Sequence, residues 1–243
     1  YTMKKKTAEA PEELIRLSKF LSHNGNYSRR EADRLIEEGR VKVNGKVVTN
    51  LATKVSNSDE VHIGKKSIRE DKNRISTVIV YNKPKGEIVS KKDPQGRKTI
   101  YDSLDHKYKH FLSVGRLDYA SEGLLLLSDS VEIVNALMHS DLERVYKIKV
   151  NGVITKPVEQ AMQNGLEIED ATGGAFKTTK IKSMSFAPFL AYDILTNSEK
   201  FSKIKVVISE GKNRELRRFF AHFGLDILDL KRLEYGGISL NNL

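Results

Sequence analysis

The sequence of 243 residues contains no cysteine. Disulfide bonds, thiolate catalysis and metal sites with cysteine ligands are therefore excluded. The six histidines are scattered, and we expect no metal site. No stretch approaches the roughly 18 apolar residues that a bilayer-spanning helix needs, so we expect no membrane association. The basic N-terminal stretch "YTMKKKTAEAPEE" lacks the apolar centre of a signal peptide, which favours a cytoplasmic location.

Positive charge is in excess: 42 lysines and arginines stand against 32 carboxylates, which gives a formal net charge of +10. Such an excess indicates an anionic partner, most commonly nucleic acid, although an ordinary solvated basic surface is the alternative. The length of 243 residues allows one large domain or two smaller ones. Hydrophobic residues make up 39% of the chain, which is enough for a hydrophobic core.

Changes in composition along the chain predict two domains. Residues 1–10 are expected to form a polar tail, and residues 11–67 carry the helix and hairpin signals of a small domain. The stretch "KKSIREDKNRIS" is charged and has few apolar residues, so residues 68–76 are predicted to be a linker. Residues 77–243 are expected to form a larger domain.

The small domain begins with apolar residues at helical spacing over residues 11–21, and Gly25 ends this predicted helix. A second helix is predicted to start at Ser28, because Ser28 and Glu31 have the spacing of a capping box, and to end at Gly39. The stretch "RVKVNGKVV" alternates valine with polar residues around an Asn-Gly pair, which predicts a β-hairpin, and "SDEVHIG" predicts another strand.

The larger domain mixes strand and helix patterns without a regular strand–helix–strand rhythm. The predicted strands are "TVIVY", "EGLLLLS", "RVYKIKVNGVI", "KIKVVIS" and "DLKRLEYGGI". The predicted helices are "SVEIVNALMH", "KPVEQAMQNGL" and "RELRRFFAHFG". This mixture predicts an α+β fold.

A group of cations gathers on the second helix and the hairpin of the small domain. Such a face can meet the phosphates of a structured RNA, although the carboxylates among these cations would also suit an ordinary solvated helix. The stretch from Arg16 to Val48 resembles the S-four RNA-binding domain, with "SRREA" and "GRVKVNG" in the places of that family's pattern. The resemblance implies RNA binding without catalysis. The side chains expected to meet the RNA are the clustered cations of the helix and hairpin: Arg29, Arg30, Arg34, Arg40 and Lys42.

The stretch "SVGRLDYASEGLLLLSDS" places Asp118 between a basic residue and an apolar run. A carboxylate at the end of a buried strand is held rigidly enough for chemistry, yet aspartate also commonly starts a turn. Arg116, two residues earlier, could hold an anionic substrate. Further along, Arg214 and Arg217 share one face of a predicted helix, where one of them could pair with a buried carboxylate.

Three pieces of the larger domain, "NKPKG", "GRLD" and "EGKNRELRRFFAHFG", occur in an order that resembles the RsuA/RluB family of rRNA pseudouridine synthases. The strand "VYKIKV" is similar to the strand that carries a tyrosine in that family. The resemblance covers the chain from Leu14 onward, and it implies a mixed, largely antiparallel sheet with flanking helices and a basic cleft. The sequence departs from the family at "YASEG" and "MHS", where "xxTSG" and "MHP" are usual, and Glu122 receives no role.

The resemblance also implies roles for individual side chains. Asp118 corresponds to the catalytic aspartate, Tyr146 to the tyrosine that stacks on the target base, and Arg217 to the cation that pairs with the aspartate. The expected substrate-binding residues are Arg116, placed to fill the gap left by a flipped-out base, Leu216, an apolar wall, and Lys83 and Arg214.

The implied reaction detaches uracil from its ribose and reattaches it through carbon 5. It needs no energy input and no redox change, so no cofactor is expected. The carboxylate could add to carbon 6 of the base, attack the anomeric carbon or deprotonate the sugar, and the sequence does not choose among these. The competing interpretations are a non-catalytic RNA-binding or ribosome-assembly factor and a glycosidase, which would need two carboxylates at one bond.

The stretch "KKDPQGRK" is a basic loop in which proline and glycine fix the path of the chain. It resembles the "DPxGR" pattern of the RluB branch of the family, and "LMHS" resembles that branch's "LMHP". The resemblance implies that the partner is 23S rRNA or an assembling large subunit, with one target uridine near the peptidyl-transferase region. A target in small-subunit (16S) rRNA is the alternative, and a monomer is the default expectation.

Overall fold

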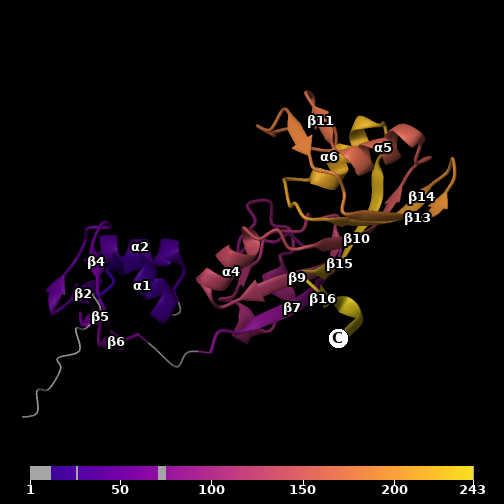
Figure 1. Ribbon diagram of the computed structural model, residues 1–243. Helices are drawn as coiled ribbons and strands as arrows, with labels where there is room; N and C mark the ends of the chain where they lie inside the picture. Colours follow the sequence, from indigo (N-terminus) through magenta and orange to yellow (C-terminus); the bar gives the residue numbers. More distant parts are fainter. Residues whose placement is uncertain (1–11, 26, 71–74, 243) are drawn as a thin grey trace, which may run out of the picture. The chain divides into compact units, whose positions relative to one another are not determined.

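The computed structural model describes residues 12–25, 27–70 and 75–242. The tail predicted for residues 1–10 and the central part of the predicted linker, residues 71–74, lie outside the described residues. The chain divides into two compact units (Figure 1). The first comprises Tyr1–Thr77 and Asp129–Val131, and the second comprises Val78–Ser128 and Glu132–Leu243.

The first unit combines two helices with short strands. The helices are α1 (Leu17–Asn24) and α2 (Arg29–Glu37). The strands are β1 (Ile15–Arg16), β2 (Val41–Val43), β3 (Lys46–Val47), β4 (Lys54–Val55), β5 (Val61–Ile63) and β6 (Lys66–Ile68). An antiparallel sheet has the order β3-β2-β5-β6, and β1 pairs with β4. The helices and this sheet enclose one apolar core, which includes Leu17, Phe20, Leu21, Ile36, Val41 and Val61.

The predicted helix start and hairpin of the first unit are confirmed. The hydroxyl of Ser28 accepts a hydrogen bond from the backbone N–H of Glu31 at 3.1 Å, so Ser28 caps α2. The turn between β2 and β3 has positive φ angles at Asn44 (50°) and Gly45 (80°). Positive φ at both central residues is the geometry that an Asn-Gly hairpin turn requires.

Two other predictions for the first unit are corrected. The first helix begins only at Leu17, because Ile15 lies in β1 and pairs with Val55 in antiparallel register. Ile68, assigned to the linker from its charged neighbours, is the last residue of β6 and is buried in the core. In both places a partner distant in sequence decides the local structure.

The second unit is built from strands with helices between them. The strands are β7 (Val78–Lys83), β8 (Leu112–Ser113), β9 (Glu122–Ser128), β10 (Arg144–Val150), β11 (Leu166–Ile168), β12 (Met184–Phe186), β13 (Ala191–Asn197), β14 (Ser202–Ile208), β15 (Ile227–Tyr235) and β16 (Ile238–Ser239). The helices are α3 (Ile100–Ser103), α4 (Val131–Met138), α5 (Lys156–Asn164) and α6 (Glu215–His222), with short 3-10 turns at His106–Tyr108 and Leu240–Asn242.

The main sheet has the order β13-β14-β10-β15-β9-β7, with β16 added to β15 and β8 added to β9. Its pairs are antiparallel except for β15 and β9, which run parallel. The predicted mixed, largely antiparallel α+β fold is therefore confirmed. Strands β11, β12 and β13 were not predicted, because two of them are short and β13 is an edge strand with largely exposed side chains.

The hydrophobic core of the second unit packs against the main sheet in separate clusters. Figure 1 shows α5 and α6 on the same side of β10, β13 and β14, where they share an apolar core with Ile148, Ile204 and Phe219. Strand β9 is buried on both faces: Leu125 and Leu127 belong to one cluster, and Leu124 and Leu126 belong to another. Burial on both faces explains why "GLLLL" is a continuous apolar run.

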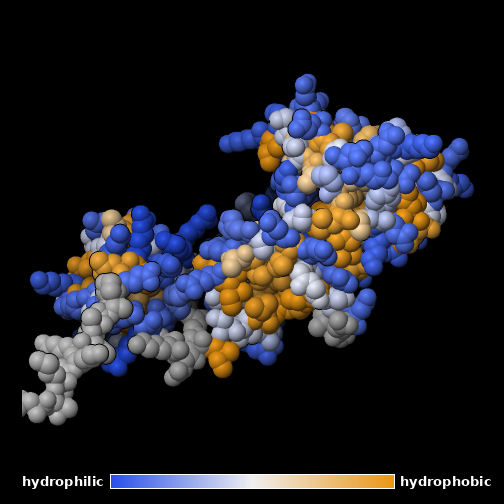
Figure 2. Space-filling model, viewed as in Figure 1, coloured by the Kyte–Doolittle hydropathy of each residue, from blue (hydrophilic) through white to orange (hydrophobic). Residues whose placement is uncertain are grey.

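The surface carries many charged groups, as expected from a chain in which 30% of residues are charged. Hydrophilic side chains cover much of the visible face of both units, with apolar groups between them (Figure 2). Among the described residues, no helix combines the length and apolarity that a membrane span requires.

Candidate active site

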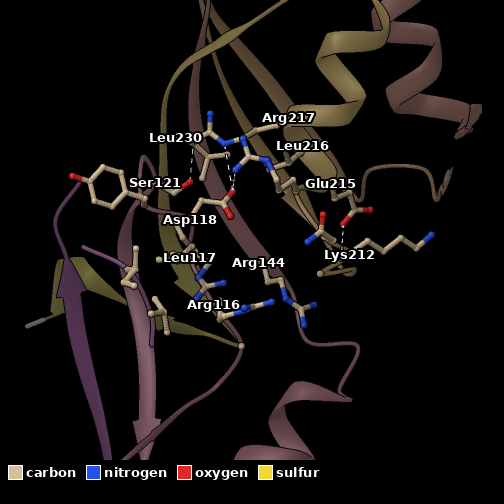
Figure 3. Close-up of a pocket in the computed structure, with 18 of the residues that line it drawn as sticks. Arg116, Leu117, Asp118, Ser121, Arg144, Lys212, Glu215, Leu216, Arg217 and Leu230 are labelled. Carbon is tan, nitrogen blue, oxygen red and sulfur yellow. Dashed lines mark hydrogen bonds and ion pairs between the residues drawn. The ribbon is translucent and has the colours of Figure 1, made fainter. Parts of the chain in front are cut away.

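Asp118 lies in a pocket of about 600 Å³ in the second unit. Its backbone C=O accepts a hydrogen bond from Ser121 N–H at 3.0 Å, which closes a turn just before β9. Its side chain is 28% exposed and lines the pocket together with Ser121 and Arg217 (Figure 3). Both interpretations of Asp118 from the sequence therefore apply: its backbone forms a turn, and its carboxylate faces an open cavity.

Two arginines from the start of α6 contact the same oxygen of this carboxylate. Nη1 of Arg214 lies 3.0 Å from Oδ2 of Asp118, and Nε of Arg217 lies 3.5 Å from it. Arg217 also donates a hydrogen bond from Nη2 to Ser121 Oγ at 3.1 Å. Burial, and next the charge of Arg214, lower the pKa of Arg217, while Asp118 opposes that shift. An arginine still carries its charge near neutral pH, so the carboxylate faces two cations.

The backbone at the start of α6 places these arginines. Arg214 is the N-cap of the helix and has a left-handed conformation, with φ 47° and ψ 35°. Such a conformation is uncommon for a residue other than glycine and costs of order 1–3 kcal/mol. Nε of Arg214 donates to the C=O of Gly174 at 2.7 Å, and its guanidinium lies 4.3 Å from the ring centre of Phe176. These contacts hold the guanidinium beside Asp118.

An apolar wall faces the carboxylate. Tyr146, on β10, is 7% exposed, and Leu216 and Leu230 are also buried. All three line the pocket, and Figure 3 shows Leu216 and Leu230 close to Asp118. A wall of this kind can receive the flat face of a base. The structure thus brings together five of the predicted residues around one pocket: Asp118, Tyr146, Arg214, Leu216 and Arg217.

Arg116 and Lys83 have different surroundings. Arg116 is exposed and lines the pocket, and in Figure 3 it lies with Arg144 on the side of Asp118 away from Arg217. Lys83 is fully buried and does not line the pocket. Its Nζ donates to the C=O of Ser121 at 2.6 Å, and burial lowers its pKa to about 8. Lys83 therefore supports the turn after Asp118 from behind, and we assign it no direct contact with substrate.

Two buried arginines that the sequence did not single out also line the pocket. Arg144 donates from Nη1 to the carbonyls of Leu142 and Ser209, at 2.9 and 2.7 Å. Arg232 donates from Nε to the C=O of Leu124 at 2.8 Å, while its Nη2 is buried without a partner. Both lie within predicted strands, and apart from their charge no feature of the sequence indicates that they line the pocket.

A pair of carboxyl groups lies at the far side of the pocket. Glu215 is buried at the start of α6, and its Oε2 accepts from Lys212 N–H at 3.2 Å. Burial, followed by the neighbouring carboxyl of Glu210, raises the pKa of Glu215 to about 8. Nothing in the sequence marks this pair, because the burial of Glu215 arises only in the fold.

The predicted RNA-binding cations of the first unit lie on α2, just after it and on β2. All of them are exposed to solvent: Arg29, Arg30, Arg34, Arg40 and Lys42. Arg34 makes a partial ion pair with Glu38 at 3.8 Å, and both side chains remain open to water. These side chains are therefore accessible to phosphates.

Metal ligands were not predicted, although His106 and His110 have the HxxxH spacing. Within residues 12–25, 27–70 and 75–242, no three histidine, aspartate or glutamate side chains are grouped so that they could hold a metal ion. The candidate catalytic group is the carboxylate of Asp118, which lies beside two arginines in a pocket that also has apolar lining residues.

Comparison with known proteins matches both units. Residues 77–222 match the family model of RNA pseudouridylate synthase, and residues 15–61 match that of the S4 domain. An uncharacterized RNA pseudouridine synthase of Helicobacter pylori is 55% identical over 229 residues, which cover 94% of this chain and 87% of that protein. The ribosomal large subunit pseudouridine synthase B of Bacillus subtilis is 37% identical over 233 residues, which cover 95% of this chain and 89% of the relative. A crystal structure of a pseudouridylate synthase shares the fold, with a TM-score of 0.57 at 24% identity over 93% of this chain and 90% of that one.

Proposed function

The chain belongs to the RNA pseudouridylate synthase family and carries an S4 domain ahead of the synthase part, and from that premise we propose that it isomerises a uridine of large-subunit rRNA with Asp118 as the catalytic group. Membership of this family makes the chain an RNA-modifying isomerase. The interpretations as a non-catalytic assembly factor or a glycosidase are therefore set aside.

One observation carries the assignment of Asp118: its carboxylate faces an open pocket while two arginines contact its Oδ2. A purely structural ion pair does not need an open cavity beside it. Here the carboxylate is 28% exposed and faces the pocket, while both arginines contact the same one of its two oxygens. Preorganised groups of this kind are typical of catalytic sites.

The chemistry requires the bond between N1 of uracil and the ribose to break, a bond from carbon 5 to form, and the proton on carbon 5 to leave. In our proposal Asp118 acts on the base or the sugar, while Arg214 and Arg217 hold its carboxylate. The base must leave its stack, which costs a few kcal/mol. Stacking on Tyr146 returns roughly 1–3 kcal/mol. Because the reaction involves no net redox change, we propose no cofactor.

The choice of large-subunit rRNA rests on a relative and on a loop. The Bacillus subtilis protein is named a ribosomal large subunit pseudouridine synthase. In the loop "KDPQGR", Arg97 donates from its backbone N–H and from Nε to Asp93 at 2.7 and 2.9 Å, and this hydrogen bonding lowers the pKa of Asp93 to about 2. The loop is thereby compact, and both residues line the pocket. A basic loop at the edge of the pocket can contact the phosphates of a folded RNA.

The experiment is to incubate the protein with large-subunit and small-subunit rRNA fragments side by side and to map pseudouridine by mass spectrometry. We expect one modified uridine, in the large-subunit fragment. Modification only of the small-subunit fragment would contradict the choice of substrate and leave Asp118 in place. Modification of neither fragment would contradict rRNA as the substrate class.

A further inference from the structure

Phe176 is an exposed aromatic residue at the pocket that contains Asp118. Its side chain is 55% exposed, and it lines the pocket. A single exposed apolar residue needs no explanation by itself. The surroundings of Phe176 are unusual, however, because a set of buried contacts fixes the loop that carries it.

The loop lies between β11 and β12 and is anchored by a buried arginine of α6. Arg218 is only 1% exposed, and its Nη1 donates to the C=O of Ala171 at 2.9 Å and to the C=O of Ile181 at 3.0 Å. Its Nη2 donates to Oγ1 of Thr179 at 3.0 Å. One fixed guanidinium thus binds both ends of the segment that contains Phe176, which restricts the motion of the loop.

Close backbone contact fixes the loop a second time. Gly174 has φ +72°, and a Cβ atom there would lie 2.5 Å from the C=O oxygen of Arg217. A Cβ on Gly173 would lie 3.2 Å from the Cβ of Ala221. Only glycine allows the chain to lie this close to α6 at position 174. Phe176 follows two residues later, so its position is set by the helix.

A single guanidinium connects the ring to the carboxylate. Arg214 lies 4.3 Å from the ring centre of Phe176, and its Nη1 lies 3.0 Å from Oδ2 of Asp118. Because Arg214 covers one face of the ring, a planar group can still stack on the opposite face. Arg214 would then separate that planar group from Asp118, so the group cannot be the uracil on which Asp118 acts.

We propose that Phe176 forms a second base-binding subsite, which stacks the nucleobase of a nucleotide next to the target uridine. This inference rests on the proposed function, since it assumes that the target uridine is at Asp118. Stacking on an aromatic ring accepts any base, because every base has a flat π face. Exposed lysines of the same loop, Lys177, Lys180 and Lys182, supply the charges that phosphates of an unpaired strand require.

The test uses a short RNA hairpin with one unpaired uridine in its loop and 2-aminopurine as its 5′ or 3′ neighbour. Quenching of 2-aminopurine fluorescence reports stacking, and titration gives Kd. We expect quenching at one of the two neighbours with the wild-type protein. In Phe176→Ala the quenching should disappear, and Kd should rise roughly 5- to 150-fold, the range that stacking of one base implies. Phe176→Trp should restore both.

The control is Phe201→Ala. Phe201 also has a cation near its ring, Lys149 Nζ at 4.7 Å, but it does not line the pocket. Its loss should leave quenching and Kd unchanged. Quenching that survives in Phe176→Ala, or a Kd that rises equally in both variants, would overturn the subsite. The assay needs no turnover, so it gives a result even if pseudouridine mapping contradicts the proposed function.

Discussion

Nη1 of Arg214 lies 3.0 Å from Oδ2 of Asp118, closer than the Nε atom of Arg217, which lies 3.5 Å from the same oxygen. The sequence left either arginine as a partner for a carboxylate, and the family resemblance pointed to Arg217. In the structure Arg217 divides its guanidinium between Asp118 and the hydroxyl of Ser121. The two arginines therefore have different tasks: Arg214 joins the carboxylate to the loop of Phe176, and Arg217 joins it to the turn before β9.

Replacing Arg217 with methionine should lower the rate of the chemical step more than it lowers RNA affinity. The reason is that Arg217 is largely buried and contacts a carboxylate and a hydroxyl rather than open solvent. Loss of one preorganised donor typically costs roughly 100- to 1000-fold in rate. Single-turnover kinetics at saturating RNA, together with a binding titration, separate the two effects. A weaker affinity with a shallower salt dependence and an unchanged rate would mark Arg217 as a phosphate contact.

Replacing Gly174 with alanine should distort the start of α6. An added Cβ would meet the C=O oxygen of Arg217 at 2.5 Å, in a backbone conformation with φ +72°. The matched control is Gly224→Ala: Gly224 has φ +73° but nothing within 4 Å of the added atom, so it carries the backbone strain without the clash. In denaturant unfolding, Gly174→Ala should lose more free energy of unfolding than the control, which is expected to lose roughly 1 kcal/mol. Equal losses would contradict the close contact.

Replacing Glu215 with glutamine should change how stability depends on pH. Burial and the carboxyl of Glu210 raise the pKa of Glu215 from 4.5 to about 8, so the folded protein holds a proton that the unfolded chain releases. Stability from this group is present below pH 4.5 and is lost as pH rises towards 8. Glutamine cannot lose that proton, so the variant should gain stability over wild type across this window, by at most about 1.4 kcal/mol per pH unit. A constant difference in the free energy of unfolding from pH 4.5 to 8 would contradict the raised pKa of Glu215.

Local sequence patterns predicted the elements that depend on neighbours in the chain. The cap at Ser28, the Asn-Gly turn and the buried run of β9 each follow from a few adjacent residues. The start of the first helix was missed, because Ile15 pairs with Val55, a residue that no local pattern connects to it. Ile68 was placed in the linker for a similar reason, since its partner strand β5 decides that it is buried.

In the candidate site, too, features that depend on neighbouring residues were predicted and features that depend on distant segments were not. The motif around Asp118 and the arginines of α6 are visible in the sequence, and resemblance indicated that they meet. Burial was not visible: Lys83 is completely enclosed and supports the turn at Ser121, while Glu215 keeps its proton because of the fold around it. Arg232 reaches the pocket only because β15 lies beside β9. Properties that arise from packing between distant segments cannot be read from spacing.

The central claim is that Asp118 performs the chemistry, and the most direct test compares wild type with Asp118→Asn on an rRNA fragment that the wild-type protein modifies. Asparagine keeps the shape of the side chain and removes its charge, so thermal unfolding and RNA affinity should change little. Single-turnover pseudouridine formation, measured by mass spectrometry, should fall below about one per cent of the wild-type rate, since loss of the group that performs the chemistry costs several powers of ten. A folded Asp118→Asn variant that retains a larger share of that rate would contradict the account.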